Sequence, residues 1–337
     1  TMQALKPNQL DRVFKLCYKL RKPLFISSSP GIGKTDKVKQ LCKEMKLNLI
    51  DLRLSYYGLE ELKGLPNFKG DFTKWFPPDF FPREGNGVFF CDELTNAPMA
   101  VQGIAMQLTH ERKLTSSYTL PDGWVVFGAG NKQSDKSLAN RMPSALVNRF
   151  LKVEVEPDFD SFYNYGLANG MHLSILSYLR KFKPGHLYTF EPAKWANDEP
   201  FASPRSWESL SNFIKEDSSA VLDLSSGIAQ GLVGEGVASE FVAYQKYFKK
   251  LPTMESIIEK PKTAMIPEEP HLIYAIISGL ARLATLKTID NIFVYSDRLD
   301  RELATCLMKD IIMLHKDTLY DHARITKWFA ENQKYFT

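Results

Sequence analysis

The chain has 337 residues, of which 44% are hydrophobic and 24% are charged, and its formal net charge is +4. This length and composition are typical of a globular protein with two or three domains. No apolar run approaches the ~20 residues that cross a membrane, and the first residues lack the apolar segment of a signal peptide. The small net charge, spread along the chain, neither requires nor excludes a nucleic-acid partner.

The first half of the chain alternates predicted strands with predicted helices. Residues 8–20 have apolar side chains at helical spacing and predict an amphipathic helix. An apolar strand follows from residue 23. Strands separated by helices favour a mostly parallel sheet covered on both faces, with ligands at the carboxyl ends of the strands. Further strands are predicted at 47–52, 87–91, 124–129 and 150–155, and helices at 36–45 and 97–111.

Residues 23–35, PLFISSSPGIGKT, predict a strand, a loop rich in Ser and Gly, and a helix that opens with Gly-Lys-Thr. This is the layout of a phosphate-binding P-loop, where unpaired N–H groups at a helix N-terminus hold a triphosphate. We expect Lys34 to reach the β- and γ-phosphates and the Thr35 hydroxyl to bind Mg²⁺. The full pattern has Gly six residues before the lysine, where this chain has Ser28. The predicted phosphate-binding residues are Ser29, Pro30, Gly31, Ile32, Gly33, Lys34 and Thr35.

Two later strands end in polar residues. In VFFCDEL (88–94), Asp92 is suited to hold Mg²⁺ through water and Glu93 to polarise an attacking water, as hydrolysis at the γ-phosphate requires. In WVVFGAGN (124–131), Asn131 is suited to orient the water near Glu93 and to contact the γ-phosphate. Taken alone, an Asn after Gly is also typical of a turn. The order of the three motifs favours the functional interpretation.

Two segments carry arginines beside the end of a strand or the start of a helix. Arg149, in SLANRMPSALVNRF (137–150), precedes the last predicted strand, and Arg141 lies in the same segment. Arg205, in ASPRSWESL (202–210), lies in the first turn of a helix capped by Ser203 with Pro204 at its first position. An Arg is electrostatically unfavourable there, which indicates a partner anion.

After about residue 156 the strand signal fades and helical patterns dominate. Prolines mark an irregular connection at 182–203 and a linker at 251–270. We therefore predict three parts: a nucleotide-binding α/β domain (1–156), a helical lid domain (157–250) and a helical C-terminal extension (251–337).

The ordered set SSPGIGKT, VFFCDEL, GAGN, ALVNRF and SPR resembles the AAA+ ATPases, specifically the MoxR-like branch, over roughly residues 20–210. The resemblance implies a P-loop NTPase sheet of strand order 5-1-4-3-2 with helices on both faces, followed by an all-α lid. It assigns Lys34 and Thr35 to Walker A, Asp92 and Glu93 to Walker B, and Asn131 to sensor 1. Arg149 corresponds to the arginine finger and Arg205 to sensor 2. The implied activity is hydrolysis of Mg-ATP to ADP and phosphate. The departure at Ser28 is expected to affect nucleotide affinity more than function.

The resemblance also implies an assembly. Similar proteins work as ring hexamers with the site between neighbours, so that Arg149 acts in trans, while Arg205 stays open between cis and trans. Relatives commonly work with a separate partner that carries a von Willebrand factor A domain, and they remodel or mature a protein client. This chain has no Asp-x-Ser-x-Ser run of such a domain. The role of residues 251–337 is open, and we expect oligomerisation or partner docking.

Residues 56–86 are unusually rich in aromatic side chains. They suit either a pore or partner-contacting surface or packing onto the sheet. Residues 112–123 predict a hairpin that is another candidate contact. The aromatic residues are Tyr56, Tyr57, Phe68, Phe72, Trp75, Phe76, Phe80 and Phe81.

Two further functions stay open. One is a nucleic-acid motor or loader on the same fold, with KYFKKL (246–251) as the best basic patch. The other is a nucleotide-dependent switch with little turnover, against which Glu93 argues.

The four cysteines, Cys17, Cys42, Cys91 and Cys306, lie far apart and form no metal-binding pair. We expect a protein of the reducing cytoplasm, with Cys91 buried as a small hydrophobe in a strand.

Overall fold

The structure is a computed structural model that describes residues 3–67, 73–115, 117–132, 135, 140, 142–192 and 199–332. The chain divides into two compact units, Thr1–Asp158 and Phe159–Thr337. In the described part of the chain, no helix combines the length and the apolar character needed to span a bilayer.

The first unit is built on a five-stranded sheet whose neighbouring strands all run parallel. Read from β9 across the sheet, the strands are the fifth, first, fourth, third and second of the sheet in chain order, so the predicted order 5-1-4-3-2 is confirmed. The strands across the sheet are β2 (Asn48–Arg53), β5 (Asn86–Asp92), β8 (Gly123–Asn131), β1 (Leu24–Ser28) and β9 (Leu151–Glu154).

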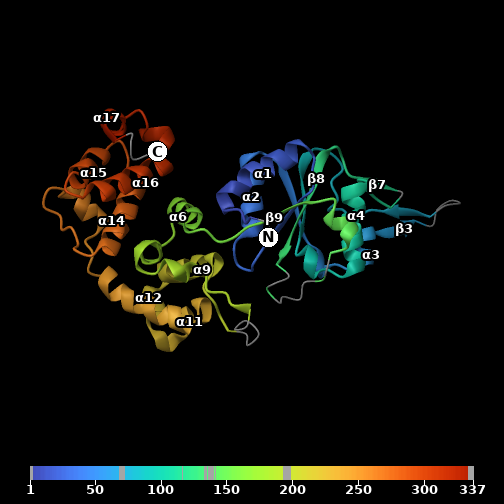
Figure 1. The fold of residues 1–337 in the computed structure, drawn as a ribbon, viewed down its shortest axis with the longest axis horizontal. Helices are drawn as coiled ribbons and strands as arrows, with labels where there is room; N and C mark the ends of the chain where they lie inside the picture. The colour runs from blue at the N-terminus through green and yellow to red at the C-terminus, as the bar shows by residue number, and fades with distance from the viewer. Residues whose placement is uncertain are drawn as a thin grey trace. The chain divides into compact units, whose positions relative to one another are not determined.

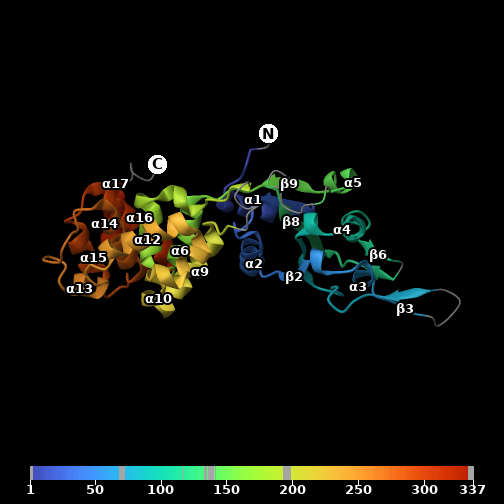
Figure 2. The ribbon, with the colours of Figure 1, turned by 90° about the horizontal axis from the view of Figure 1, so that it is seen from below.

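Helices cover both faces of this sheet, as Figures 1 and 2 show. The alternation of side chains along each strand sends Ile26 and Phe127 to one face and Phe25 and Phe89 to the other. On the first face, Phe14 of the amphipathic helix packs edge-on against Phe127 with ring centroids 4.9 Å apart. The first face is covered by α1 (Pro7–Lys19) and α2 (Lys34–Glu44), and the second by α3 (Leu59–Lys63), α4 (Met99–His110) and α5 (Ser144–Val147).

Two short ribbons and two 3₁₀ turns, η1 (Leu54–Tyr56) and η2 (Leu94–Asn96), complete the unit. The ribbons are antiparallel pairs of β3 (Leu65–Asn67) with β4 (Lys74–Phe76), and of β6 (Lys113–Leu114) with β7 (Tyr118–Thr119). The second pair forms the hairpin predicted over residues 112–123.

The aromatic residues of 56–86 divide between the two interpretations. Phe81 is buried, stacks on Phe89 at 5.2 Å between centroids and contacts Phe80, which in turn packs with Tyr57. Tyr56 and Phe76 are exposed. Phe68 and Phe72 lie outside the described residues.

The described residues of the second unit form helices and loops around two apolar cores. One core centres on Trp207 and Tyr178, and the other on the apolar helix α14. The helices are α6 (Phe159–Ala168), α7 (Leu173–Ser177), η4 (Tyr178–Phe182), η5 (Pro184–Leu187), α9 (Pro204–Glu216), α10 (Ser218–Leu222), η6 (Leu224–Ser226), α11 (Ile228–Val233), α12 (Glu235–Phe248), α13 (Met254–Glu259), α14 (Pro270–Arg282), α15 (Ile289–Ser296), α16 (Arg301–Leu319) and α17 (Ala323–Asn332).

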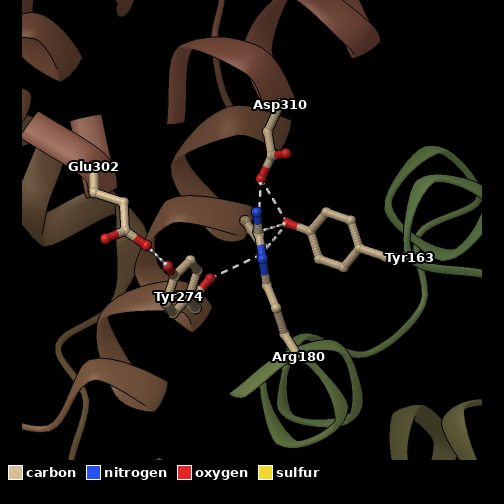
Figure 3. Close-up of polar contacts among 6 residues, drawn as sticks. Tyr163, Arg180, Tyr274, Glu302 and Asp310 are labelled. Carbon is tan, nitrogen blue, oxygen red and sulfur yellow. Dashed lines mark hydrogen bonds and ion pairs between the residues drawn. The ribbon is translucent and has the colours of Figure 1, made fainter. Parts of the chain in front are cut away.

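A buried polar network joins helices from the predicted lid and the predicted C-terminal extension (Figure 3). Arg180 in η4 lies between the rings of Tyr163 and Tyr274, 4.2 Å and 4.6 Å from their centroids, and pairs with Asp310 at 3.1 Å. The Tyr163 hydroxyl donates to Asp310 Oδ2 at 2.5 Å. Because buried charges are costly unless paired, this network constrains how α6, η4, α14 and α16 pack. The boundary at residue 250 stays a prediction.

Candidate functional site

The P-loop lies between β1 and α2, at the carboxyl end of the sheet's first strand in chain order. Gly31 and Gly33 have φ of 78° and 88°, in the left-handed region that glycine adopts without strain. Gly33 is the N-cap residue of α2, an 11-residue helix that begins at Lys34. The first-turn N–H groups of a helix lack partners within the helix and lie at the positive end of its dipole, so this position suits an anion.

Lys34 links the P-loop to the neighbouring strand. Its Nζ donates to Ser28 Oγ at 2.9 Å and to Asn131 Oδ1 at 3.1 Å. Ser28 and Asn131 end β1 and β8 and are register partners in the parallel sheet. The structure therefore brings together Lys34 and Asn131, which lie 97 positions apart in sequence.

Thr35 and Asp92 also meet. Thr35 Oγ1 donates to Asp92 Oδ2 at 2.6 Å, while Asp92 Oδ1 accepts from the backbone N–H of Glu93 at 2.8 Å. Asp92 is 6% exposed. A hydroxyl and a carboxylate are hard oxygen ligands of the kind that Mg²⁺ takes while it keeps several waters and substrate phosphates. The residues thus fit the predicted ion, although among the described residues no group of three or more His, Cys, Asp or Glu side chains gathers as a complete protein cage.

Glu93 has a strained backbone and a hydrogen-bonded carboxylate. Its φ of 52° and ψ of 31° lie in the left-handed region, a backbone conformation that residues other than glycine rarely adopt. Such strained residues cluster at functional sites. Its Oε2 accepts a hydrogen bond from Ser55 Oγ at 2.7 Å. Ser55 lies in η1, directly after β2, whose last residue Arg53 pairs with Asp92 in the sheet.

Ser55 is a candidate site residue that the sequence motifs did not predict. One sequence feature could have identified it. Ser55 is a polar residue shortly after a predicted strand, just as Asp92 and Asn131 lie at the ends of theirs. The contact between Ser55 and Glu93 depends on the strand order, because that order makes β2 a neighbour of β5.

Arg149 lies near the amino ends of the strands, whereas the P-loop lies at their carboxyl ends. The first residue of β9, Leu151, pairs with Leu24, the first residue of β1. Arg149 therefore precedes the amino end of this strand pair, whereas the P-loop follows the carboxyl end of β1. A five-residue strand such as β1 spans about 16 Å. Arg149 Nη1 donates to Ala145 O at 2.6 Å. The structure does not bring Arg149 to Lys34 within one chain.

Arg205 belongs to the second unit. It lies in the first turn of α9, where Ser203 is the N-cap, accepts from the Ser206 N–H at 3.2 Å, and precedes Pro204 at the first helical position. Its side chain is exposed and forms no ion pair with a described residue. Arg141 lies outside the described residues.

Cys91 precedes the acidic pair at the end of β5. Burial, with a smaller contribution from the Asp92 charge, raises the pKa of its thiol to about 12. It therefore stays a neutral thiol at physiological pH and packs as a small apolar residue, as predicted.

The strand order and the P-loop geometry together decide the fold. The first unit has a P-loop NTPase fold. No model of a known protein family matches the chain. Over an aligned length of 175 residues, which covers 48% of this chain and 4% of the other protein, the chain is 29% identical to midasin of Giardia intestinalis.

Solved structures resemble the chain at low sequence identity. A single-residue mutant of RuvB from Thermotoga maritima aligns with a TM-score of 0.39 and 12% identity, over 82% of this chain and 83% of that one. NtrX from Brucella abortus in complex with ADP aligns with a TM-score of 0.40 and 12% identity, over 89% of this chain and 68% of that one.

Proposed function

We propose that this chain is an Mg-ATP-dependent ATPase of the AAA+ class, MoxR-like, that assembles into a ring and remodels or matures a protein client. The observation that supports it best is the convergence of Lys34, Thr35, Asp92, Glu93 and Asn131 at one edge of a parallel sheet. These side chains come from the ends of two strands, β5 and β8, and from the P-loop and helix that follow a third, β1. Together they supply the cation, the metal ligands and the base that γ-phosphate hydrolysis needs.

In the proposed mechanism, backbone N–H groups from Ser29 to Thr35 bind the phosphates and Lys34 turns toward the β- and γ-oxygens. Thr35 and Asp92 would hold Mg²⁺, which when bound would neutralise charge on the phosphate oxygens. Glu93 accepts a proton from the attacking water, and Asn131 orients that water by hydrogen bonding. Release of Glu93 from Ser55 precedes this step, because the carboxylate must turn toward the water.

The proposed ring follows from the position of Arg149 and from the family resemblance. An arginine near the amino ends of the strands is far from the P-loop of its own chain. It can therefore stabilise γ-phosphate charge only on a neighbouring subunit. We propose that Arg149 acts in trans in a hexamer and that Arg205 contacts nucleotide phosphates. A separate protein carrying a von Willebrand factor A domain is the proposed partner.

The function is tested with two single variants. Lys34→Ala should lose ATP binding, because the phosphate charge then lacks its cation. Glu93→Gln should keep ATP binding and lose turnover by about 10²–10⁴-fold, the usual contribution of a positioned base. Normal affinity in Lys34→Ala refutes the P-loop assignment, and normal turnover in Glu93→Gln refutes the base.

A nucleic-acid motor is a second candidate, favoured by one observation. Although the net charge of the whole chain is small, residues 6–46 hold eleven Lys and Arg against three Asp and Glu. Arg12, Lys15 and Lys19 are exposed at helical spacing on the outer face of α1. ATPase activity stimulated by DNA or RNA, with stimulation that falls steeply with salt, would favour this candidate over a protein client.

A further inference from the structure

Residue 28 is where this chain departs from the P-loop pattern. Ser28 is fully buried at the end of β1, and its hydroxyl oxygen accepts from the Lys34 ammonium at 2.9 Å. The same ammonium lies 3.1 Å from Asn131 Oδ1, 3.3 Å from Ser28 O and 3.4 Å from Ser29 O. A glycine at position 28 would leave the two carbonyls and the amide but remove the shortest of these four contacts.

The backbone conformation at position 28 does not require a glycine. The residues of the described chain with positive φ include Gly31 and Gly33 but not Ser28, so this position carries no left-handed strain that would call for glycine. The hydroxyl is also well oriented. Its proton goes to Ser29 O at 3.0 Å, which leaves its lone pairs to accept from Lys34.

We infer that Ser28 is a positioning residue that holds the Lys34 ammonium in the nucleotide-free pocket and thereby lowers nucleotide affinity. The inference rests on the proposed function, since it assumes that Lys34 binds phosphate. An ammonium has three N–H donors, and in the free protein they are directed at the oxygens of Ser28, Ser29 and Asn131. Lys34 must redirect donors to the phosphates when nucleotide binds.

The cost of that redirection is largest for the shortest, charge-assisted bond in a buried site. Ser28 therefore stabilises the free state more than the bound state. Removal of its hydroxyl should destabilise the free protein and tighten nucleotide binding at the same time. A purely structural role would not produce these opposite signs, because loss of packing weakens the pocket and the fold together.

The test compares Ser28→Ala with the wild-type chain by isothermal titration with Mg-ADP and by thermal unfolding without nucleotide. We expect the Kd for Mg-ADP to fall about three- to tenfold, the equivalent of one net hydrogen bond, and the Tm without nucleotide to decrease. Ser27→Ala is the matched control. It removes a hydroxyl from the preceding buried residue, whose side chain points to the opposite face of the strand, and its Kd should stay at the wild-type value.

The outcomes separate the two proposals. A wild-type chain that does not bind Mg-ADP refutes the proposed function. A wild-type chain that binds, with unchanged or weaker binding in Ser28→Ala, overturns the role of Ser28 alone. Ser28→Gly restores the usual pattern and serves if the alanine variant does not fold, with the same expected direction.

Discussion

Thr35 Oγ1 lies 2.6 Å from Asp92 Oδ2, which joins residues 57 positions apart in sequence. Thr35 is the second residue of α2, which follows β1, and Asp92 ends β5. In the sheet, β8 lies between β1 and β5. The contact spans that strand, so it forms only when the three strands are assembled in this order. It fixes the pair of oxygens that we propose as Mg²⁺ ligands.

Asp92→Asn should remove most of the effect of Mg²⁺ on ATP binding. The amide oxygen can still accept from Thr35, but it lacks the charge that a divalent cation requires. We expect the tightening of ATP binding by Mg²⁺ to fall about tenfold or more, while binding in EDTA stays near the wild-type value. The measurement is a titration with and without Mg²⁺. Equal Mg²⁺ dependence in both proteins would rule out Asp92 as a ligand.

Ser55→Ala should raise the basal ATPase rate. Ser55 Oγ donates to Glu93 Oε2 at 2.7 Å, and the carboxylate must give up this hydrogen bond before it turns toward the attacking water. We expect an increase of roughly threefold, about the value of one net hydrogen bond. The control is Ser55→Ala in a Glu93→Gln background, where no increase should remain. A lower rate in the single variant would mean that Ser55 supports the active position of Glu93.

Arg149→Ala should keep ATP binding and assembly but lose most hydrolysis, by about 10³-fold or more if it acts as an arginine finger. Mixing tests whether it acts on a neighbour. Arg149→Ala subunits retain Glu93, and Glu93→Gln subunits retain Arg149, so a mixed ring contains complete sites although each variant alone is inactive. Recovery of activity on mixing supports action in trans, and no recovery from rings that are shown to mix contradicts it.

His172 should make the helical unit sensitive to acid. Burial first, and then the charges of Lys215 and Arg282, lower the pKa of His172 to about 4. Its Nδ1 accepts the Ser174 N–H at 3.3 Å as the N-cap of α7. The unfolded chain binds a proton below its ordinary pKa of 6.5, but the folded protein does not until about pH 4. Stability is therefore complete above the unfolded pKa and falls as the pH decreases toward the folded one.

The decrease in the free energy of unfolding that His172 causes should reach about 2 kcal/mol at about pH 5. His172→Asn is the matched variant, because Asn is a good N-cap that does not titrate. Urea unfolding at neutral pH and at about pH 5 should show a smaller loss for the variant than for the wild-type chain. The same loss in both would mean that His172 does not carry the acid sensitivity.

The sequence by itself determined the local features of this protein. Each apolar strand, each helix with its 3.6-residue spacing and the Gly-rich loop before Lys34 depend on neighbours within a few residues, and those neighbours are printed in the chain. For that reason the parallel sheet with helices on both faces was predicted correctly from residues alone. The strand order came from the resemblance of the motifs, not from periodicity.

Only the tertiary structure decided which side chains meet. Asn131 with Lys34, Ser55 with Glu93, and Arg180 with Asp310 are contacts between side chains whose types are common in ordinary turns and helices. Their meaning depends on which strands are neighbours and which helix faces pack, and these are long-range choices that no local window contains. Arg149 shows the same rule: its distance from the P-loop follows from the direction of β9 beside β1.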